Sequence, residues 1–407
     1  MKLRPDMLDE RSPEGIEVVQ LTEEGVPSSH VYMEAQIFTP DSRRLVLHRS
    51  ATAHGSDQDD PEHRYLVCEI EDACALRPIT EEVGATAPSV SPAGRLLYYF
   101  VNQTEPGGGT LTLKRVEMDG ACRETLTVLD SPLPGTSYRP SRIYPLSTIS
   151  SDGARTALSC FLGDGRTERA PFGLMVFGLD AGEVRLILEG TSWCNIHPQY
   201  SRSLDPEESH DILVQENHGC EYDAAGAITT LTGGDGADIH VIRDDGTDFR
   251  NMPWGRDGNE RCQGHQCWRG RSARAITSTG TKQPPECQLI EGTAAPHADH
   301  VGIHTPGGVR RDLSRSFEDP QFCHFGTDTA GRRLITDCKP DSIWLAELPE
   351  ADGDPVGKWT YLCRSGSSWT KEAHVHPFLS PDGTMGFFNS DESGMLQAYM
   401  IRGLDTI

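Results

Sequence analysis

Short apolar and alternating runs, separated by turn residues, recur along the whole chain. The clearest unit spans His376–Asp391, where HPFLS leads into a Pro-Asp-Gly turn and then into the apolar run MGFFNSD. Pro, Asp and Gly provide the backbone angles of a tight turn. Few stretches show the 3.6-residue spacing of apolar positions that an amphipathic helix requires. The pattern predicts an all-β protein built from strand–turn–strand units.

This unit recurs through the chain at intervals of 51 to 68 residues. A repeat of roughly 40–50 residues with this content is typical of β-propellers, so the longer spacing predicts enlarged loops. We use the position seven residues before the turn glycine, or its equivalent, as the register position of each repeat. The seven register positions are Ala35, Ala87, Leu146, His197, His265, His324 and His376.

Most repeats end in a further polar–apolar strand, but the last repeat stops after residues 396–404 without one. A similar strand precedes the first repeat, at about residues 17–24. If it completed the last blade, it would close the ring and remove an exposed sheet edge. We therefore predict one domain over residues 1–407, a seven-bladed β-propeller closed by its N-terminal strand. The outer strands that define this pattern lie at 74–82, 182–190 and 359–366.

Histidine occupies four of the seven register positions, although only 15 of the 407 residues are His. The register lies on the strand before the turn, which we predict to be the innermost strand of each blade. His374 precedes His376 by two residues, so a regular strand would place both on one face. We expect five imidazoles to point into one side of the central channel.

Neutral imidazoles bind transition metals and transfer protons, so both uses follow from such a cluster. His374 and His376, with His324 from the neighbouring blade, are the predicted metal ligands, and they leave coordination positions open. His265, one blade further round, is the predicted base. His218, in the segment QENHGC, lies either at the channel mouth or in a surface loop.

Composition excludes several classes of function. Lys plus Arg is 37 and Asp plus Glu is 61, a net charge of −24, which argues against a nucleic-acid partner. We expect no membrane partner, because no apolar stretch approaches the ~20 residues of a membrane span. The N-terminus lacks the apolar segment of a secretory signal, so we expect a cytoplasmic protein whose twelve cysteines are reduced and mostly buried. A group of arginines is expected to make the channel mouth locally positive for an anionic substrate: Arg256, Arg261, Arg269, Arg271 and Arg274.

Taken together, these segments resemble the oligogalacturonate lyases, propellers related to the TolB-type repeat. The resemblance covers most of the chain and is firmest from about residue 190 onward. The N-terminal stretches QLTEEG and HVYMEAQIFTPDS also match. The most specific matches are IHPQYS at 196–201, GNERCQGHQCW at 258–268, FCHF at 322–325 and HVHPFLSPDG at 374–383.

The resemblance implies a manganese ion held by three histidines and a glutamine, with a separate histidine as the base. Carried onto this sequence, the ligands are His324, His374 and His376, and the base is His265. The glutamine precedes the HxH pair by three residues in the family, and this chain has Lys371 there. The fourth ligand is therefore open between water and His197, and another divalent transition metal remains possible.

A second departure concerns the arginine that the family places before the strand at 236–242, apparently for a substrate carboxylate. Asp238 stands near that place in this chain. Lys371, Arg261 and Arg256 are the candidates for the missing cation. The two departures leave open which uronate the site would accept.

The resemblance and the histidines predict a metal-dependent lyase that cleaves uronate-containing acidic oligosaccharides by β-elimination. His265 would remove the proton at C5, which lies α to the carboxylate. Two other functions stay open. One is a non-catalytic TolB-like propeller that binds a protein partner, and the other is a metal-dependent hydrolase or epimerase of sugar acids. The sequence does not indicate the oligomeric state.

Overall fold

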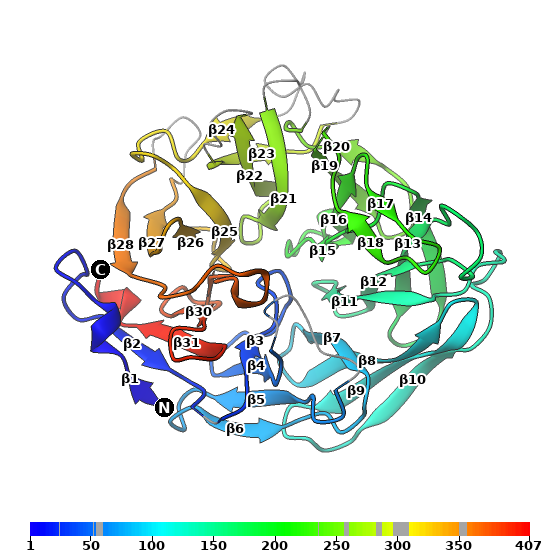
Figure 1. The fold of residues 1–407 in the computed structure, drawn as a ribbon, viewed down its shortest axis with the longest axis horizontal. Coiled ribbons are helices and arrows are strands. Elements are labelled where there is room, and N and C mark those ends of the chain that lie inside the picture. The colour runs from blue at the N-terminus through cyan, green and yellow to red at the C-terminus, as the bar shows by residue number, and fades with distance from the viewer. Residues whose placement is uncertain are drawn as a thin grey trace.

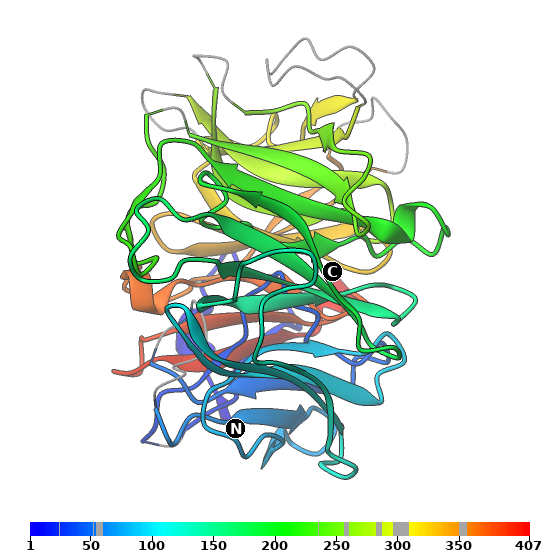
Figure 2. The same cartoon turned by 90° about the vertical axis from the view of Figure 1, so that its right-hand side faces the viewer.

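The computed structural model describes residues 1–23, 25–51, 53, 60–234, 236–255, 260–281, 287–295, 309–349 and 356–407. In this part of the chain, antiparallel sheets stand radially around a central axis and form seven blades (Figure 1). Seen from the side, neighbouring sheets face one another around the ring (Figure 2). The prediction of an all-β seven-bladed propeller is confirmed. None of the helices in the described ranges is long and apolar enough to cross a membrane.

The first three blades follow the chain in order from the innermost to the outermost strand. Blade 1 contains β3 (Ser29–His30), β4 (Arg44–His48), β5 (Tyr65–Glu69) and β6 (Ala75–Pro78). Blade 2 contains β7 (Ala85–Val90), β8 (Leu96–Glu105), β9 (Gly108–Glu117) and β10 (Glu124–Leu129). Blade 3 contains β11 (Arg142–Ile149), β12 (Arg155–Phe161), β13 (Phe172–Gly178) and β14 (Val184–Gly190).

The next three blades repeat this order. Blade 4 contains β15 (Gln199–Tyr200), β16 (Asp211–Asn217), β19 (Ala237–Arg243) and β20 (Arg250–Asn251). Blade 5 contains β21 (Glu260–Trp268), β22 (Arg274–Thr281), β23 (Cys287–Thr293) and β24 (Arg310–Asp312). Blade 6 contains β25 (Phe322–Thr327), β26 (Arg333–Cys338), β27 (Ser342–Glu347) and β28 (Trp359–Cys363). A hairpin of β17 (Glu221–Tyr222) and β18 (Ile228–Thr230) lies between β16 and β19, and it accounts for the longest interval between register positions.

Blade 7 joins the two ends of the chain. It contains β29 (Phe378–Leu379), β30 (Gly386–Ser390) and β31 (Gln397–Arg402), and β2 (Glu17–Gln20) pairs antiparallel with β31 as the outer strand. Val18 and Val19 of β2 are fully buried, and β1 (Lys2–Leu3) adds a short fifth strand outside β2. The predicted closure by the N-terminal strand is confirmed, with pairing over 17–20.

The turn after the inner strand has a repeated local structure. The hydroxyl of Thr39, Ser150 or Ser380 donates a hydrogen bond of 2.5–2.6 Å to the carboxylate two residues later. These side-chain contacts fix the turn from residues next to each other in sequence. The residue that follows has a positive φ, 58° at Ser42 and 72° at both Gly153 and Gly383, which glycine adopts without steric cost.

The register positions coincide with irregular backbone. Strand pairing breaks between Cys262 and Gln266 and between Phe322 and Phe325, around His265 and His324. His197 and His376 have φ values of 47° and 46°, in the left-handed region that few non-glycine residues adopt. Such a break bends a strand and re-aims its side chains, so the histidines reach the channel through irregular backbone. The predicted shared strand face of His374 and His376 is wrong, because both lie before β29.

The apolar core lies between adjacent blades. One cluster packs Val19, Leu45, Leu97 and Phe387, which come from blades 7, 1 and 2. Neighbouring pairs of blades bury similar clusters around the ring. All twelve cysteines are free and only Cys122 is exposed, as expected from the sequence. The rigid sheets thus hold the irregular ends of the inner strands in place.

Candidate functional site: a histidine cluster at the channel

The three predicted ligands His324, His374 and His376 lie together. One ligand atom from each ring lies within 4.8 Å of the other two. The ring centroid of His324 is 4.4 Å from that of His376 and 5.1 Å from that of His374. His324 comes from β25, and the other two come from the segment between η4 (Lys371–Ala373) and β29. Three converging imidazoles fit a transition metal with open coordination positions.

Two of these rings are oriented by groups behind them. His324 Nδ1 lies 2.7 Å from Asp337 Oδ2, and His376 Nδ1 donates to the carbonyl of Ala53 at 3.1 Å. Asp337 Oδ1 also accepts the backbone N–H groups of His324 at 2.7 Å and of Cys323 at 3.2 Å. A proton on Nδ1 makes Nε2 the nitrogen that can bind a metal. Metal-ligating histidines are usually held in this way by a carboxylate or a carbonyl.

Burial favours the neutral imidazole, which is the form that binds a metal. It lowers the pKa of His324 well below its ordinary value, with a further contribution from His374, and it also lowers the pKa of His374. Burial raises the pKa of Asp337 to about 7. Imidazoles with lowered pKa values are neutral at neutral pH, and the neutral ring is the metal ligand.

The predicted base, His265, lies beside this cluster. Its ring centroid is 4.5 Å from that of His324, and its side chain is only partly buried. Cys323 lies beside both rings, with Sγ 3.9 Å from His265 Nδ1 and 3.7 Å from His324 Nε2. Burial raises the pKa of the Cys323 thiol, which keeps it protonated. His265 is thus close to the three histidines and outside their group.

His197 lies near the cluster but has other partners. Its Nδ1 is 2.7 Å from Glu34 Oε2, and its Nε2 is 2.9 Å from the Tyr144 hydroxyl. Tyr32 packs between His197 and His376, with ring centroids 5.3 and 4.5 Å away. Since both ring nitrogens of His197 are engaged, the structure does not bring it into the metal-binding group. A role as fourth ligand would require it to exchange one of these contacts.

The other predicted residues lie in several places. Lys371 is exposed in η4, and Arg261 is exposed with its chain against Gly236. Arg256 falls outside the described residues. His218 joins Glu216 and Asp238 in a separate cluster on blade 4.

The expectation that the arginines of blade 5 make the channel mouth positive is wrong for three of them. Arg269 and Arg274 lie 2.7 and 3.8 Å from Glu291, a carboxylate that they share with Arg311, so their position and not their charge decides the matter. Arg271 stands at the turn after the inner strand, and it lines a cavity that none of the clustered histidines lines. The reason is topological, because these residues surround the turn between β21 and β22.

Several residues of the site have no signal in the sequence pattern. Asp337 is a fully buried acid in the strand RLITDC, and Ala53 contributes a backbone carbonyl from a distant loop. Trp369 stacks 6.4 Å from His324, and the exposed Lys339 ammonium lies 5.2 Å from the Trp369 ring centroid. The position of Asp337 inside β26, the second strand of blade 6, is the one feature of the sequence that could have indicated it.

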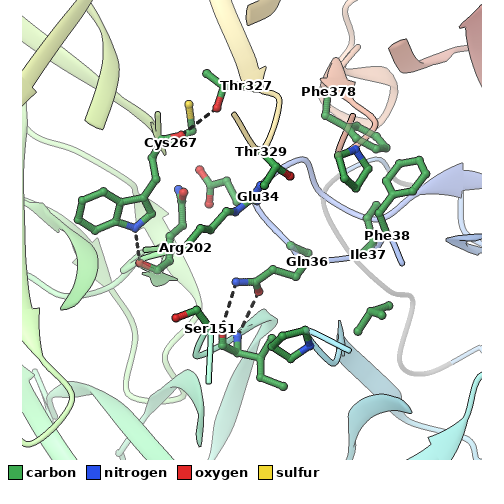
Figure 3. A pocket seen from close by; sticks show the side chains of 18 of the residues that line it. Glu34, Gln36, Ile37, Phe38, Ser151, Arg202, Cys267, Thr327, Thr329 and Phe378 are labelled. Carbon is green, nitrogen blue, oxygen red and sulfur yellow. Dashed lines mark hydrogen bonds between the residues drawn. The ribbon is translucent and has the colours of Figure 1, made fainter. Parts of the chain in front are cut away.

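A cavity of about 180 Å³ is lined by turns that follow the inner strands and by none of the clustered histidines (Figure 3). Turn residues such as Pro40, Pro92 and Pro381 line it, together with Glu34 and Arg202. Figure 3 shows Glu34 and Arg202 among the side chains that surround this space. Glu34 also contacts His197, so one residue connects the cavity with the histidine end. The converging rings place the candidate chemistry at the histidines and not in this cavity.

Comparison with known proteins identifies the fold. No protein-family model and no curated protein matches the sequence. The structure is similar to an oligogalacturonate lyase from Vibrio parahaemolyticus, with a TM-score of 0.69 and 15% identity over 96% of this chain and 95% of that one. It is equally similar to an oligogalacturonate lyase in complex with manganese, with a TM-score of 0.69 and 18% identity over 95% and 93% of the two chains.

A prolyl endopeptidase structure is less similar, with a TM-score of 0.52 and 12% identity, and only 48% of that chain is covered. The two lyases, in contrast, match this chain along nearly its whole length. Identities of 15% and 18% establish a shared architecture and not a shared activity. The chain is therefore a seven-bladed propeller with the fold of the oligogalacturonate lyases and a histidine cluster suited to a metal ion.

Proposed function

We propose that this protein is a metal-dependent lyase that cleaves uronate-containing oligosaccharides by β-elimination. The observation behind this proposal is the juxtaposition of His265 with the cluster of His324, His374 and His376, at 4.5 Å between the rings of His265 and His324. The three-histidine cluster can hold a cation while His265 removes a proton. The likeness in fold to two oligogalacturonate lyases, one of them in complex with manganese, supports the same reading.

The residues present fit a divalent transition metal, and Mn²⁺ is the ion that we propose. Three neutral nitrogen donors converge, and the rings of His324 and His376 are held by Asp337 and Ala53. When bound, the ion would neutralise a substrate carboxylate and stabilise the negative charge that develops beside C5. Because the three ligands are neutral, they leave the ion's charge available to the substrate.

In the proposed reaction, neutral His265 accepts the proton from C5 of the uronate. The electron pair of the C5–H bond becomes the C4–C5 double bond, and the bond from C4 to the glycosidic oxygen breaks. The protonated His265 then returns its proton to the departing alkoxide or to solvent. The products are a shorter oligosaccharide and a 4,5-unsaturated uronate. A positioned base of this kind contributes roughly 10²–10⁴-fold to the rate.

Lys339, which the sequence did not indicate, offers a positively charged side chain for the substrate carboxylate. Lys339 is exposed, and its ammonium contributes to the lowered pKa values of His324 and His374, so it lies near the cluster. Trp369 lies between this lysine and the histidines, and a partly buried aromatic ring offers a flat surface to a sugar. We propose that Lys339 attracts the anionic substrate, in the role considered for Lys371, Arg261 and Arg256.

The test is ultraviolet absorbance during incubation with a panel of uronate oligosaccharides, with added Mn²⁺ and with a chelator. Elimination creates a conjugated double bond, so we expect a chelator-sensitive rise in absorbance on at least one substrate. Products without the double bond would replace this proposal with the hydrolase or epimerase alternative. A protein that binds no metal at the histidines and changes no substrate would point to a non-catalytic binding propeller.

The roles within the site are separated by one variant and a matched control. His265→Ala should keep its metal and lose at least about 100-fold in turnover. His210→Ala, at a histidine in η2 (Glu208–His210) that pairs with Asp244, should leave both unchanged. Loss of metal in His265→Ala, or turnover near the wild-type rate, would contradict the assignment of the base.

A further inference from the structure

Blade 4 has a second cluster of possible metal ligands. Glu216, His218 and Asp238 each offer a ligand atom, and these atoms lie within 4.8 Å of one another. Glu216 and Asp238 are directly opposite each other on the paired strands β16 and β19, so their side chains share one face of the sheet. His218 follows β16 in the connection to the β17–β18 hairpin. The regular sheet therefore brings the two carboxylates together before any ion binds.

The donor atoms are close to the spacing that a metal requires. His218 Nε2 lies 2.7 Å from Asp238 Oδ2 and 3.6 Å from Glu216 Oε2. His240, two residues after Asp238 on β19, places its Nε2 3.3 Å from Glu216 Oε2. Ligands at 2.0–2.2 Å from a tetrahedral ion are separated by about 3.4 Å. Two of these three contacts already have that separation, and the shortest would open by about 0.7 Å.

The outer atoms of two possible ligands are held by residues outside the cluster. The Ser192 hydroxyl donates to Glu216 Oε1 at 2.5 Å, while Oε2 faces the histidines. His240 Nδ1 is 2.9 Å from Asn251 Oδ1, while Nε2 faces Glu216. Metal ligands are commonly oriented in this way by hydrogen bonds to their far atoms. Ser192 and Asn251 thus turn Glu216 Oε2 and His240 Nε2 toward each other.

Burial and charge favour a cation there. The side chain of Asp238 is fully buried, and those of Glu216 and His218 are about one-fifth exposed. A divalent ion matches the two negative charges of Glu216 and Asp238. With a neutral imidazole as the third ligand, the site as a whole carries no net charge. The nitrogen and oxygen donor set suits Zn²⁺ and Mn²⁺.

We propose that Glu216, His218 and Asp238 form a second divalent-metal site, with a fourth coordination position left open and His240 next to Glu216. It would tie the end of β16 to the start of β19 and so fix the hairpin on blade 4. Its carboxylates neutralise the ion, so the role is structural. The proposal does not depend on the proposed lyase function, since it uses none of the residues of the channel cluster.

The experiment measures zinc per chain after metal removal, reloading with ZnCl₂ and desalting. We expect two equivalents in the wild type and one in the His374→Ala protein, which retains only the blade 4 site. The isosteric Glu216→Gln and Asp238→Asn variants should each lose one equivalent and keep the other. In the His374→Ala background, added Zn²⁺ should raise the midpoint of thermal unfolding, and Glu216→Gln should abolish that shift.

The matched control is Glu207→Gln, which changes a highly exposed carboxylate of the same blade and should keep both equivalents. Since Glu216 is partly exposed, its variant is expected to fold even if Asp238→Asn does not. Two equivalents retained in Glu216→Gln would overturn the proposal, as would a His374→Ala protein that holds no zinc. A wild type with one equivalent that only the blade 4 variants lose would support this site and contradict the proposed metal at the channel histidines.

Discussion

Replacing Asp337 with asparagine tests how the protein orients the histidines of the proposed metal site. The Asp337 side chain accepts three hydrogen bonds, one at His324 Nδ1 and two from the backbone N–H groups of His324 and Cys323. An asparagine of the same shape has one acceptor oxygen and one amide donor. If its oxygen keeps the two backbone groups, its amide faces His324 Nδ1, which must then accept. The imidazole proton moves to Nε2, and that nitrogen can no longer bind a metal.

The size of the effect follows from the lost hydrogen bond. To bind a metal through Nε2, His324 would have to carry its proton on Nδ1, where it would point at the amide N–H of the asparagine. This arrangement loses a charge-assisted hydrogen bond of about 1.5–3 kcal/mol. That energy corresponds to a loss of roughly 10- to 150-fold in metal affinity, in line with the roughly 10–100-fold typical of such partners. Folding should be retained, because asparagine also removes the cost of a buried carboxyl group whose pKa burial raises to about 7.

The assay is competition for Mn²⁺ and Zn²⁺ against a fluorescent chelator, in the wild-type and Glu216→Gln backgrounds, so that the blade 4 cluster is accounted for. Asp319→Asn is the control, because Asp319 is exposed and its φ of 52° suits asparagine. Nitrogen NMR of the imidazoles should show the proton of His324 on Nε2 in the variant. An affinity within about twofold of the wild type would refute the orientation by Asp337.

Three further predictions concern the fold. Deleting residues 1–21 removes the buried Val18, Val19 and Leu21; at about 1.5–3 kcal/mol each, the loss rivals the stability of a whole domain. We expect this chain to aggregate in size-exclusion chromatography, and a folded monomer would contradict closure by β2. In urea unfolding, Gly270→Ala should lower the stability of the protein more than Gly135→Ala. Both glycines have a positive φ, but a Cβ at Gly270 would lie 2.4 Å from the Gly331 backbone nitrogen, whereas a Cβ at Gly135 would meet no atom within 4 Å. Equal losses would show that φ alone decides. Burial lowers the pKa of His30 from 6.5 to about 4. As the pH falls from 6.5 to 4, the unfolded chain therefore takes up a proton before the folded chain does, and the free energy of unfolding falls by up to about 3 kcal/mol. His30→Gln should flatten this slope, and an unchanged slope would assign it to other groups.

The blades were predictable because their turns are encoded locally. Thr39, Ser150 and Ser380 each bond to the aspartate two residues later, so neighbouring residues alone determine the turn. The missing outer strand of the last repeat likewise indicated how the ring closes. The positions of the histidines in each repeat followed from counting back from these turns. That count needed no knowledge of contacts between blades.

The path of the backbone at the histidines was not predictable in the same way. His376 and His197 have positive φ values although they are not glycine, and nothing in their residue type indicates this. The expected alternation on a regular strand was therefore wrong for His374 and His376, even though both side chains reach the cluster. Their supporting partners come from other segments, such as Ala53, 323 residues before His376. Tertiary packing sets this geometry, and a sequence pattern does not contain it.

The two candidate metal-ligand clusters differ in charge, and this difference separates the roles proposed for them. His324, His374 and His376 are uncharged donors, so an ion held there would keep its double positive charge in a protein with a net charge of −24. Glu216 and Asp238 would cancel that charge on blade 4, which leaves no attraction for an acidic sugar. The exposed Lys339 ammonium lies near the channel histidines, whereas Arg269 and Arg274 lie around the turn between β21 and β22. Under the proposed function, an ion at the channel cluster would place positive charge next to His265, where the proton of an anionic substrate would be removed.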